Sequence, residues 1–176
     1  MTRLHGLAPV FDANTRVLVL GSFPGVASLR AQQYYGHPQN QFWKILGALW
    51  SQDLMAASYP ERIAAALSHG LGIWDVYAAC EREGSLDTAI RAAELNDLAG
   101  LRQRCPALQA IAHNGGESFR HAKHTLALGV PVYRLPSTSP ANASWSFERK
   151  RAAWAEVLHY LSQAAQMSPQ KSQPET

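Results

Sequence analysis

Four short apolar runs separated by helical segments are the feature that most constrains the fold. The first run reads RVLVLG and the second LGIWDVY. Runs of this length with little charge predict strands that are buried on both faces. Because strands that alternate with helices at this spacing need crossover connections, the order predicts a parallel sheet between two helical layers. The predicted strands are residues 16–21, 71–77, 108–113 and 130–135.

Five segments are predicted to be helical, and Pro60 marks the start of the second because proline is favoured in the first turn of a helix. The predicted helices are residues 42–50, 60–70, 86–104, 117–128 and 145–163. Residues 1–15 are predicted to form a lead-in. We expect one domain over residues 1–165. Residues 166–176 consist mainly of Ser, Pro, Gln and Lys, and they are predicted to be a disordered tail.

The composition indicates a globular protein, since 47% of the 176 residues are apolar and only 16% are charged. The net charge of +3 permits a polyanionic partner but hardly favours one. Cys80 and Cys105 cannot form a four-cysteine metal cluster, and we expect free thiols in a reducing compartment. The chain shows no secretory signal and no run of membrane-spanning length. We therefore expect a soluble, cytoplasmic, monomeric protein that binds no membrane.

The residues that could bind a ligand or take part in catalysis follow the carboxyl ends of the predicted strands. GSFPG follows the first strand, and its Pro-Gly pair predicts a tight turn. Two tyrosines and an asparagine follow within YYGHPQNQFW, and Asp75 is the only charge in the second strand. Since α/β sheets bind ligands at the carboxyl ends of their strands, we predict a pocket there for a flat polar ring.

These motifs resemble those of the uracil-DNA glycosylase superfamily. GSFPG with YYGHPQNQFW resembles its first motif in the mismatch-specific branch, and LPSTSPANAS resembles the second motif, a loop that enters the DNA groove. Together with IWDV, they are most similar to the hypoxanthine-DNA glycosylase branch, over about residues 14–160. The resemblance implies a three-layer α/β/α fold with a central four-stranded parallel sheet. It also implies a monofunctional glycosylase that acts on DNA containing a deaminated base, with no metal and no cofactor.

The resemblance implies that Asn40 is the catalytic residue. Its carboxamide oxygen would orient a water molecule against the anomeric carbon of the sugar. The alternative is that Asn40 only caps the helix that follows it, a position that asparagine favours. Phe23 departs from the family pattern, because other branches carry Asn or Asp there to hold water. This departure makes Asn40 more necessary and predicts weak activity on uracil.

The resemblance also implies a set of residues that bind the flipped base. Tyr35 would stack on the base, although core packing is the commoner role of an aromatic residue. Asp75, if ionised, would accept a ring N–H of hypoxanthine or uracil, and its alternative role is to bond loop amides. Backbone amides near Ser22 and Phe23 would donate to the exocyclic oxygen. Ser137 stands where some relatives carry a histidine that stabilises the leaving group.

A further set is predicted to contact the DNA strand. Gly115 and Gly116 would hold a phosphate on backbone amides, or simply form a strand-to-helix turn. Ala141 falls near the residue that fills the gap left by the flipped base, but alanine is small for this role. A cluster of three cations around Lys150 would neutralise phosphate, or would be a solvated surface. The predicted DNA-contact residues are Gly115, Gly116, Ser139, Pro140, Ala141, Asn142 and Lys150.

The first function hypothesis is therefore a DNA glycosylase that prefers hypoxanthine to uracil, with xanthine left open. The second is a nucleic-acid-binding module on the same fold that has lost catalysis. The third is a nucleotide-binding enzyme with GSFPG as its phosphate loop, but the chain lacks the glycine patterns of such loops. His121 and His124 are three residues apart, and without a third ligand they predict no zinc site.

Overall fold

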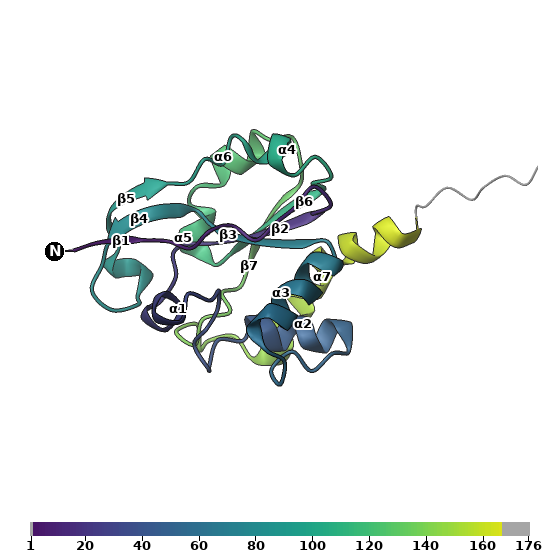
Figure 1. Cartoon of the computed structure of the whole chain (residues 1–176), viewed down its shortest axis with the longest axis horizontal. Helices are drawn as coiled ribbons and strands as arrows, with labels where there is room; N and C mark the ends of the chain where they lie inside the picture. The colour runs from purple at the N-terminus through teal and green to yellow at the C-terminus, as the bar shows by residue number, and fades with distance from the viewer. Residues whose placement is uncertain (1, 167–176) are drawn as a thin grey trace, which may run out of the picture.

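Four parallel strands form the central sheet of the computed structural model (Figure 1), which describes residues 2–166 and the side chains of residues 2–161. The strand order is β3-β2-β6-β7, and every neighbouring pair is parallel. The strands are β2 (Val17–Gly21), β3 (Leu71–Asp75), β6 (Ala110–Asn114) and β7 (Val132–Leu135). All four overlap the predicted runs, so the predicted parallel sheet is confirmed.

Two apolar cores lie on opposite faces of this sheet, because successive side chains of a strand point to opposite faces. Val17 and Val19 of β2 belong to one core, whereas Leu18 and Leu20 belong to the other. A strand that is buried on both faces has no polar side, and this explains why β2 reads as a continuous apolar run. The two cores fix a three-layer α/β/α arrangement.

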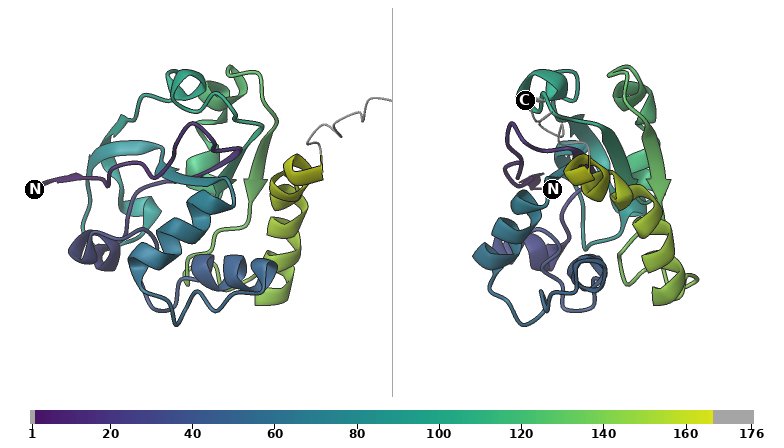
Figure 2. Two further views of the ribbon diagram at one scale, coloured as in Figure 1. Left: turned by 45° about the vertical axis from the view of Figure 1, so that its right-hand side comes forward. Right: turned by 90° about the vertical axis from the view of Figure 1, so that its right-hand side faces the viewer.

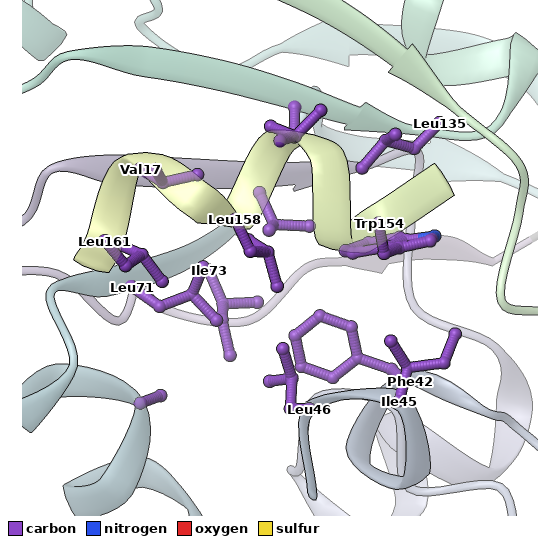
Figure 3. Close-up of a cluster of buried hydrophobic side chains, with 14 of the residues drawn as sticks. Val17, Phe42, Ile45, Leu46, Leu71, Ile73, Leu135, Trp154, Leu158 and Leu161 are labelled. Atoms are coloured by element: carbon purple, nitrogen blue, oxygen red, sulfur yellow. The ribbon is translucent and has the colours of Figure 1, made fainter. Parts of the chain in front are cut away.

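Helices cover both faces of the sheet (Figures 1 and 2). The first layer contains α2 (Phe42–Trp50), α3 (Tyr59–Ser68) and α7 (Phe147–Gln166), and the second contains α4 (Leu101–Arg104), α5 (Gly116–Phe119) and α6 (Ala122–Leu126). Figure 3 shows Phe42 and Leu46 of α2 facing the underside of α7, where Trp154 is fully buried. A short helix that the sequence did not predict, α1 (Val26–Ala31), follows β2.

The start of α3 is fixed by local chemistry, as the sequence predicts. Ser58 caps the helix by accepting the Glu61 amide at 3.3 Å, and the Glu61 carboxylate accepts the Ser58 amide at 3.1 Å. This reciprocal pair satisfies two amides that a helix end otherwise leaves without partners. Pro60 lies in the first turn.

The prediction of a helix over residues 86–104 is wrong. These residues form a 3₁₀ helix, η1 (Asp87–Ala89), then strand β5 (Arg91–Leu95) and the four-residue helix α4. Strand β5 pairs with β4 (Tyr77–Glu81), which also pairs with β1 (Arg3–His5), and the three form a second, antiparallel sheet. The sequence RAAEL favours a helix by intrinsic propensity, but its backbone pairing with β4 prevails. All five residues are exposed, so no apolar alternation marked the strand.

Other boundaries differ by less. The predicted lead-in contains β1, the predicted helix over 117–128 is divided into α5 and α6, and the last helix reaches Gln166. The remaining residues of the predicted tail, 167–176, lie outside the described residues. Both cysteines are buried and free, as expected. Within residues 2–166 no helix combines the length and the apolar character needed to cross a bilayer.

Candidate active site

A cleft of about 800 Å³ opens at the carboxyl ends of the four parallel strands. Its volume suits a base together with part of a nucleic-acid strand, since sites for small ligands measure roughly 300–1,000 Å³. With the exception of Lys150, every residue that the sequence predicts for the site lines this cleft. These residues are Ser22, Phe23, Tyr35, Asn40, Asp75, Gly115, Gly116, Ser137, Ser139, Pro140, Ala141 and Asn142.

Arg82 and Asp87 hold the loop after β2 in place. The Arg82 guanidinium lies 5.3 Å from the centroid of the Phe23 ring and donates to the Pro24 carbonyl oxygen at 2.6 Å. The Ser22 hydroxyl donates to the Asp87 carboxylate at 2.6 Å. Phe23 itself is buried in the second core, so this loop offers its backbone rather than a polar side chain to the cleft. The amides of Ser22 and Phe23 donate to no other described residue.

Gly21 allows two functional side chains to approach the backbone. A Cβ atom at this position would lie 2.4 Å from the Asp75 Oδ1 atom and 3.1 Å from the Tyr35 hydroxyl. Real Cβ atoms essentially never make a contact of 2.4 Å, and 3.1 Å is tight, so glycine is needed here to keep Asp75 and Tyr35 together. The last residue of β2 therefore sets the floor of the cleft.

Asp75 is buried at this floor with one oxygen free. Its side chain is only 5% exposed, and its Oδ2 atom has no hydrogen-bond partner among the described residues. Burial and, to a smaller extent, the charge of Asp87 raise the pKa of Asp75, the charge of Arg82 lowers it, and the resulting pKa is about 7. The predicted contact of Asp75 with a ring N–H requires the ionised carboxyl, and near neutral pH the protonated and ionised forms have similar populations.

Tyr35 is fixed by a stacking partner and a hydrogen bond. Its ring stacks on Phe42 with the centroids 4.1 Å apart, and its hydroxyl accepts the Asn114 carboxamide N–H at 3.2 Å. The backbone φ of Tyr35 is +54°, a left-handed conformation that is uncommon for an aromatic residue. Burial raises the pKa of Tyr35, and the nearby Asp75 raises it further, so the phenol stays protonated.

Asn114 links Tyr35 to the loop after β7, and it was not among the site residues predicted from the sequence. Besides the bond to Tyr35, its carboxamide donates to the Thr138 hydroxyl at 3.0 Å and accepts the Thr138 amide at 3.0 Å. Asn114 is the last residue of β6 and Thr138 follows β7. The signal was available, because Asn114 directly follows the predicted third strand in the sequence.

Asn40 lies one residue before the N-cap of α2 and also lines the cleft. Its Oδ1 atom accepts the amide of Phe42, the first residue of α2, at 2.9 Å, so Asn40 supports the start of the helix without occupying the N-cap position, which belongs to Gln41. Its Nδ2 group donates to no described residue. Because an amide oxygen has two lone pairs, this bond leaves one acceptor position on Oδ1 for a further donor such as water.

The loop after β7 is rigid through its own polar groups. The Ser137 hydroxyl accepts the Ser139 amide at 3.1 Å, and the Asn142 carboxamide donates to the Ser137 carbonyl oxygen at 3.1 Å. Gly115 packs against it, since a Cβ there would lie 3.1 Å from the Ser137 Cβ atom, and its φ of +95° also requires glycine. Pro140 and Ala141 are exposed at the cleft rim.

The cations at the cleft differ from the one that the sequence predicted. Lys150 is only 2% exposed, and burial lowers the pKa of its ammonium group, so the predicted contact with an external phosphate is not supported. Arg134 instead lines the cleft, is exposed, and makes no ion pair with any described residue. Its Nη2 atom lies so close to Gly116 that a Cβ there would be 2.9 Å away. Arg149 lies 4.1 Å from the ring of Trp145, which also lines the cleft.

His113 and His121 make hydrogen bonds that stabilise the fold. His113 is fully buried, its two ring nitrogens bond to the Ser118 and Thr125 hydroxyls at 2.8 Å each, and burial lowers its pKa to about 4. His121 bonds through Nε2 to the Tyr77 hydroxyl at 2.8 Å. Over the part of the chain that the structure describes, no group of three or more His, Cys, Asp and Glu side chains is placed to hold a metal ion.

Comparisons with known proteins point to one family. The family described as the uracil DNA glycosylase superfamily matches residues 8–161. The chain is 40% identical over 154 residues to a protein named hypoxanthine DNA glycosylase from Methanosarcina barkeri, covering 88% of this chain and 97% of that protein. A protein of the same name from Methanosarcina acetivorans is 36% identical over 156 residues, covering 89% and 98%. A solution NMR structure from M. acetivorans, provisionally assigned as a uracil DNA glycosylase, superposes with a TM-score of 0.83 at 35% identity and covers 92% and 99%.

Proposed function

Because the chain belongs to the uracil DNA glycosylase superfamily, it is a DNA glycosylase that acts on DNA, and we propose that hypoxanthine is the base it removes best. Both relatives described above are named for hypoxanthine, which supports this choice. Uracil is a poorer substrate in this proposal. A binding module without catalysis is not favoured, since the matched relatives are named as enzymes.

The observation that carries the proposal is the buried Oδ2 atom of Asp75, which has no partner among the described residues. Hypoxanthine presents a ring N–H beside a carbonyl oxygen. The ionised carboxylate would accept the ring N–H, and the amides of Ser22 and Phe23 would donate to the carbonyl. Adenine has an acceptor at that ring nitrogen and a donor in place of the carbonyl oxygen. Its acceptor would face the Asp75 carboxylate and its donor would face the backbone amides, so the buried carboxylate would stay unpaired.

Tyr35 supports a purine. One face of its ring is stacked on Phe42 and the residue lines the cleft, so a flipped base would stack on its other side. A purine offers more ring area to that stack than a pyrimidine does. Tyr35 is held at one ring face by Phe42 and at its hydroxyl by Asn114, which keeps the stacking surface in place before the base arrives.

Asn40 is proposed to position the attacking water. The C–N bond breaks towards an oxocarbenium-like sugar, and the electron pair leaves with the base as an anion. Water held on Asn40 Oδ1 then adds to the anomeric carbon, and the proton that this water loses neutralises the departed base, directly or through solvent. The bond to the Phe42 amide fixes the direction of this oxygen. Phe23 is buried in the core, so it supplies no second group to hold water, and departure of the base carries more of the barrier.

DNA strand contacts are proposed for the rim of the cleft. Gly115 and Gly116 line the cleft together with Arg134, Trp145 lines it together with the loop of residues 137–142, and Arg149 lies over the Trp145 ring, so backbone amides and two exposed cations would bind phosphates. Lys150 is withdrawn from this set because it is buried. The monomeric state, the cytoplasmic location, and the independence from metal, cofactor and membrane stay predictions from the sequence.

A panel of matched duplexes tests the proposal. Each duplex carries one hypoxanthine, uracil, xanthine or adenine, and abasic sites are scored as alkali-labile breaks under single-turnover conditions. We expect hypoxanthine opposite thymine to be excised faster than uracil opposite guanine, and adenine not to be excised. Faster excision of uracil would overturn the base preference but not the enzyme class. If no duplex gained abasic sites, the catalytic assignment itself would be wrong.

A further inference from the structure

The hydroxyl group of Tyr35 carries a proton that no described residue accepts. Its oxygen accepts the Asn114 carboxamide N–H at 3.2 Å, and this is the one hydrogen bond that the hydroxyl makes to any of residues 2–161. Burial raises the pKa of the phenol, so the proton stays on the oxygen. Buried hydroxyl groups normally find an acceptor for their proton. The Asn114 bond fixes the oxygen and leaves the proton available to a further acceptor.

Asp75 is an acceptor that lies beside this hydroxyl group. A Cβ atom at Gly21 would be 2.4 Å from Asp75 Oδ1 and 3.1 Å from the Tyr35 hydroxyl oxygen, so both oxygens lie close to one point. The Asp75 carboxyl group accepts no hydrogen bond from any described residue, and its Oδ2 atom is buried. A buried carboxylate without a donor is costly. An unused donor and an unused acceptor therefore lie together at the floor of the cleft.

The position of the Tyr35 hydroxyl is fixed before any base enters the cleft. Asn114, which donates to it, is itself bound to Thr138 by two hydrogen bonds of 3.0 Å each. The Tyr35 ring stacks on Phe42. The left-handed φ of +54° costs free energy, and such a conformation persists only where the surrounding contacts maintain it. These contacts hold the hydroxyl next to Asp75 in the free protein.

We propose that the Tyr35 hydroxyl donates a hydrogen bond to the Asp75 carboxylate and so favours the ionised form that accepts the ring N–H of the base. Tyr35 is then a positioning residue as well as a stacking surface. The inference rests on the proposed function, because it concerns the group that reads the base. A hydrogen bond to the charged form of an acid favours that form, and a protonated carboxyl gains less from the same donor. The bond therefore forms as Asp75 loses its proton.

Three other groups affect the charge of Asp75. The charge of Asp87 raises the pKa of Asp75, and the charge of Arg82 lowers it. The Nε and Nη2 atoms of Arg82 already donate to backbone carbonyl oxygens. Tyr34 is a second phenol near Asp75, but its hydroxyl donates to two backbone carbonyl oxygens, so its proton is used. Of the two tyrosines, Tyr35 is therefore the one with a proton to give.

The first test follows the titration of Asp75 in the free protein by NMR of its carboxyl carbon, assigned by the loss of its signal in Asp75→Asn. Tyr35→Phe keeps the ring and removes the hydroxyl. We expect it to move the titration midpoint of Asp75 upwards by about one pH unit, as the loss of one hydrogen bond to a charged group does. Tyr160→Phe is the matched control, because it removes a hydroxyl that bonds to Tyr133 outside the cleft, and it should leave the midpoint in place. An unchanged midpoint in Tyr35→Phe would overturn the inference.

A second variant strengthens the donor instead of removing it. Replacing Tyr35 by 3-fluorotyrosine makes the phenol more acidic while the ring and the hydroxyl remain. We expect the titration midpoint of Asp75 to move downwards, opposite to its movement in Tyr35→Phe. Loosened packing around the ring could not produce shifts in both directions. A midpoint that moved upwards in both variants would contradict the hydrogen bond.

The last measurement connects the bond to excision of hypoxanthine. We expect the rising part of the pH profile of kcat/KM to move to higher pH in Tyr35→Phe by as much as the NMR midpoint does. The variant should therefore lose about tenfold in kcat/KM at pH 6 and much less at pH 8.5. An equal loss at every pH would overturn the inference, because it would reflect altered stacking alone. If the parent excises hypoxanthine at no pH, the proposed function fails, while the NMR titration still decides whether Tyr35 donates to Asp75.

Discussion

Replacing Asp75 by asparagine is expected to stabilise the protein at neutral and higher pH while it destroys base selection. Burial raises the pKa of Asp75 from an ordinary 3.8 to about 7. Between these values the unfolded chain carries an ionised carboxyl, whereas the folded protein still holds the proton. The free energy of unfolding therefore falls as pH rises from about 4 to about 7. Above this range the folded protein carries a buried charge without a hydrogen bond at Oδ2.

The size of the effect follows from the two pKa values. A difference of about three pKa units corresponds to roughly 4 kcal/mol, at about 1.4 kcal/mol per unit. Asparagine would place an N–H group near the unpartnered Oδ2 position, and a buried donor without an acceptor costs about 1–3 kcal/mol. We expect a net gain of roughly 1–3 kcal/mol at pH 8 and none at pH 5, where Asp75 keeps its proton. At about 2–4 °C per kcal/mol for a chain of this size, the melting temperature should rise by about 2–12 °C.

Urea unfolding of both proteins at several values between pH 5 and pH 8.5 measures this difference. The free energy of unfolding of Asp75→Asn minus that of the parent should increase with pH and level off above about pH 7.5. Glu156→Gln, which removes an exposed carboxylate from α7, serves as the control and should give a difference that does not change in this way. If the free energies of unfolding of the parent and Asp75→Asn changed with pH in parallel, Asp75 would titrate as an ordinary carboxyl, and the expected stabilisation would be wrong.

Activity should respond in the opposite direction. Since the ionised carboxylate accepts the ring N–H of hypoxanthine, kcat/KM of the parent should rise with pH by about 50-fold between pH 5 and pH 7. Asp75→Asn should lower kcat/KM and remove this dependence. A stabilised variant with unchanged excision would show that the buried carboxyl does not read the base.

Three further predictions follow from other contacts. Asn40→Ala should lose the hydrogen bond to the Phe42 amide, which lowers the free energy of unfolding in urea by about 1 kcal/mol, and should slow excision by about 100-fold or more. Asn40→Ser should restore the stability but not the activity. If serine restored both, the role of Asn40 would be limited to the start of the helix. Arg134→Ala should lower the slope of log K against log salt by about 0.9 in DNA titrations, and an unchanged slope would remove Arg134 from the phosphate contacts. Lys150→Met should raise the free energy of unfolding by about 1 kcal/mol or more with the salt slope intact, and a slope lowered by about one would restore Lys150 as a phosphate contact.

The central sheet and the place of the site could be predicted from the sequence alone. A run such as VLVLG places apolar side chains on both faces of a strand, and both faces must then be covered. The sequence therefore predicts that β2 is a buried strand at the centre of an α/β sheet. The turn-forming and polar residues directly follow the strands, and parallel strands bring those ends to one edge. For this reason the predicted residues, other than Lys150, line one cleft although they are spread over more than 100 positions in the chain.

The second sheet could not be predicted from the sequence, because it depends on contacts between distant segments. Residues 91–95 have the composition of a helix and lie exposed, so neither propensity nor apolar pattern identified them as β5. Their conformation comes from backbone hydrogen bonds to β4, which the side chains do not encode locally. This sheet matters for the site, because the segment between β4 and β5 carries Leu86 and Asp87 to the cleft.

The protonation and pairing of the site residues were also decided by the tertiary structure. The pKa of Asp75 depends on how completely it is buried and on Asp87 and Arg82, which come from other segments. Lys150 belongs to a run of cations in the sequence, yet it points inward because of its place on α7, and Arg134 takes the exposed position at the cleft. Burial, and with it the strength of each charge and hydrogen bond, is set by segments that meet only after the chain has folded, and for this reason sequence located these groups without fixing their chemistry.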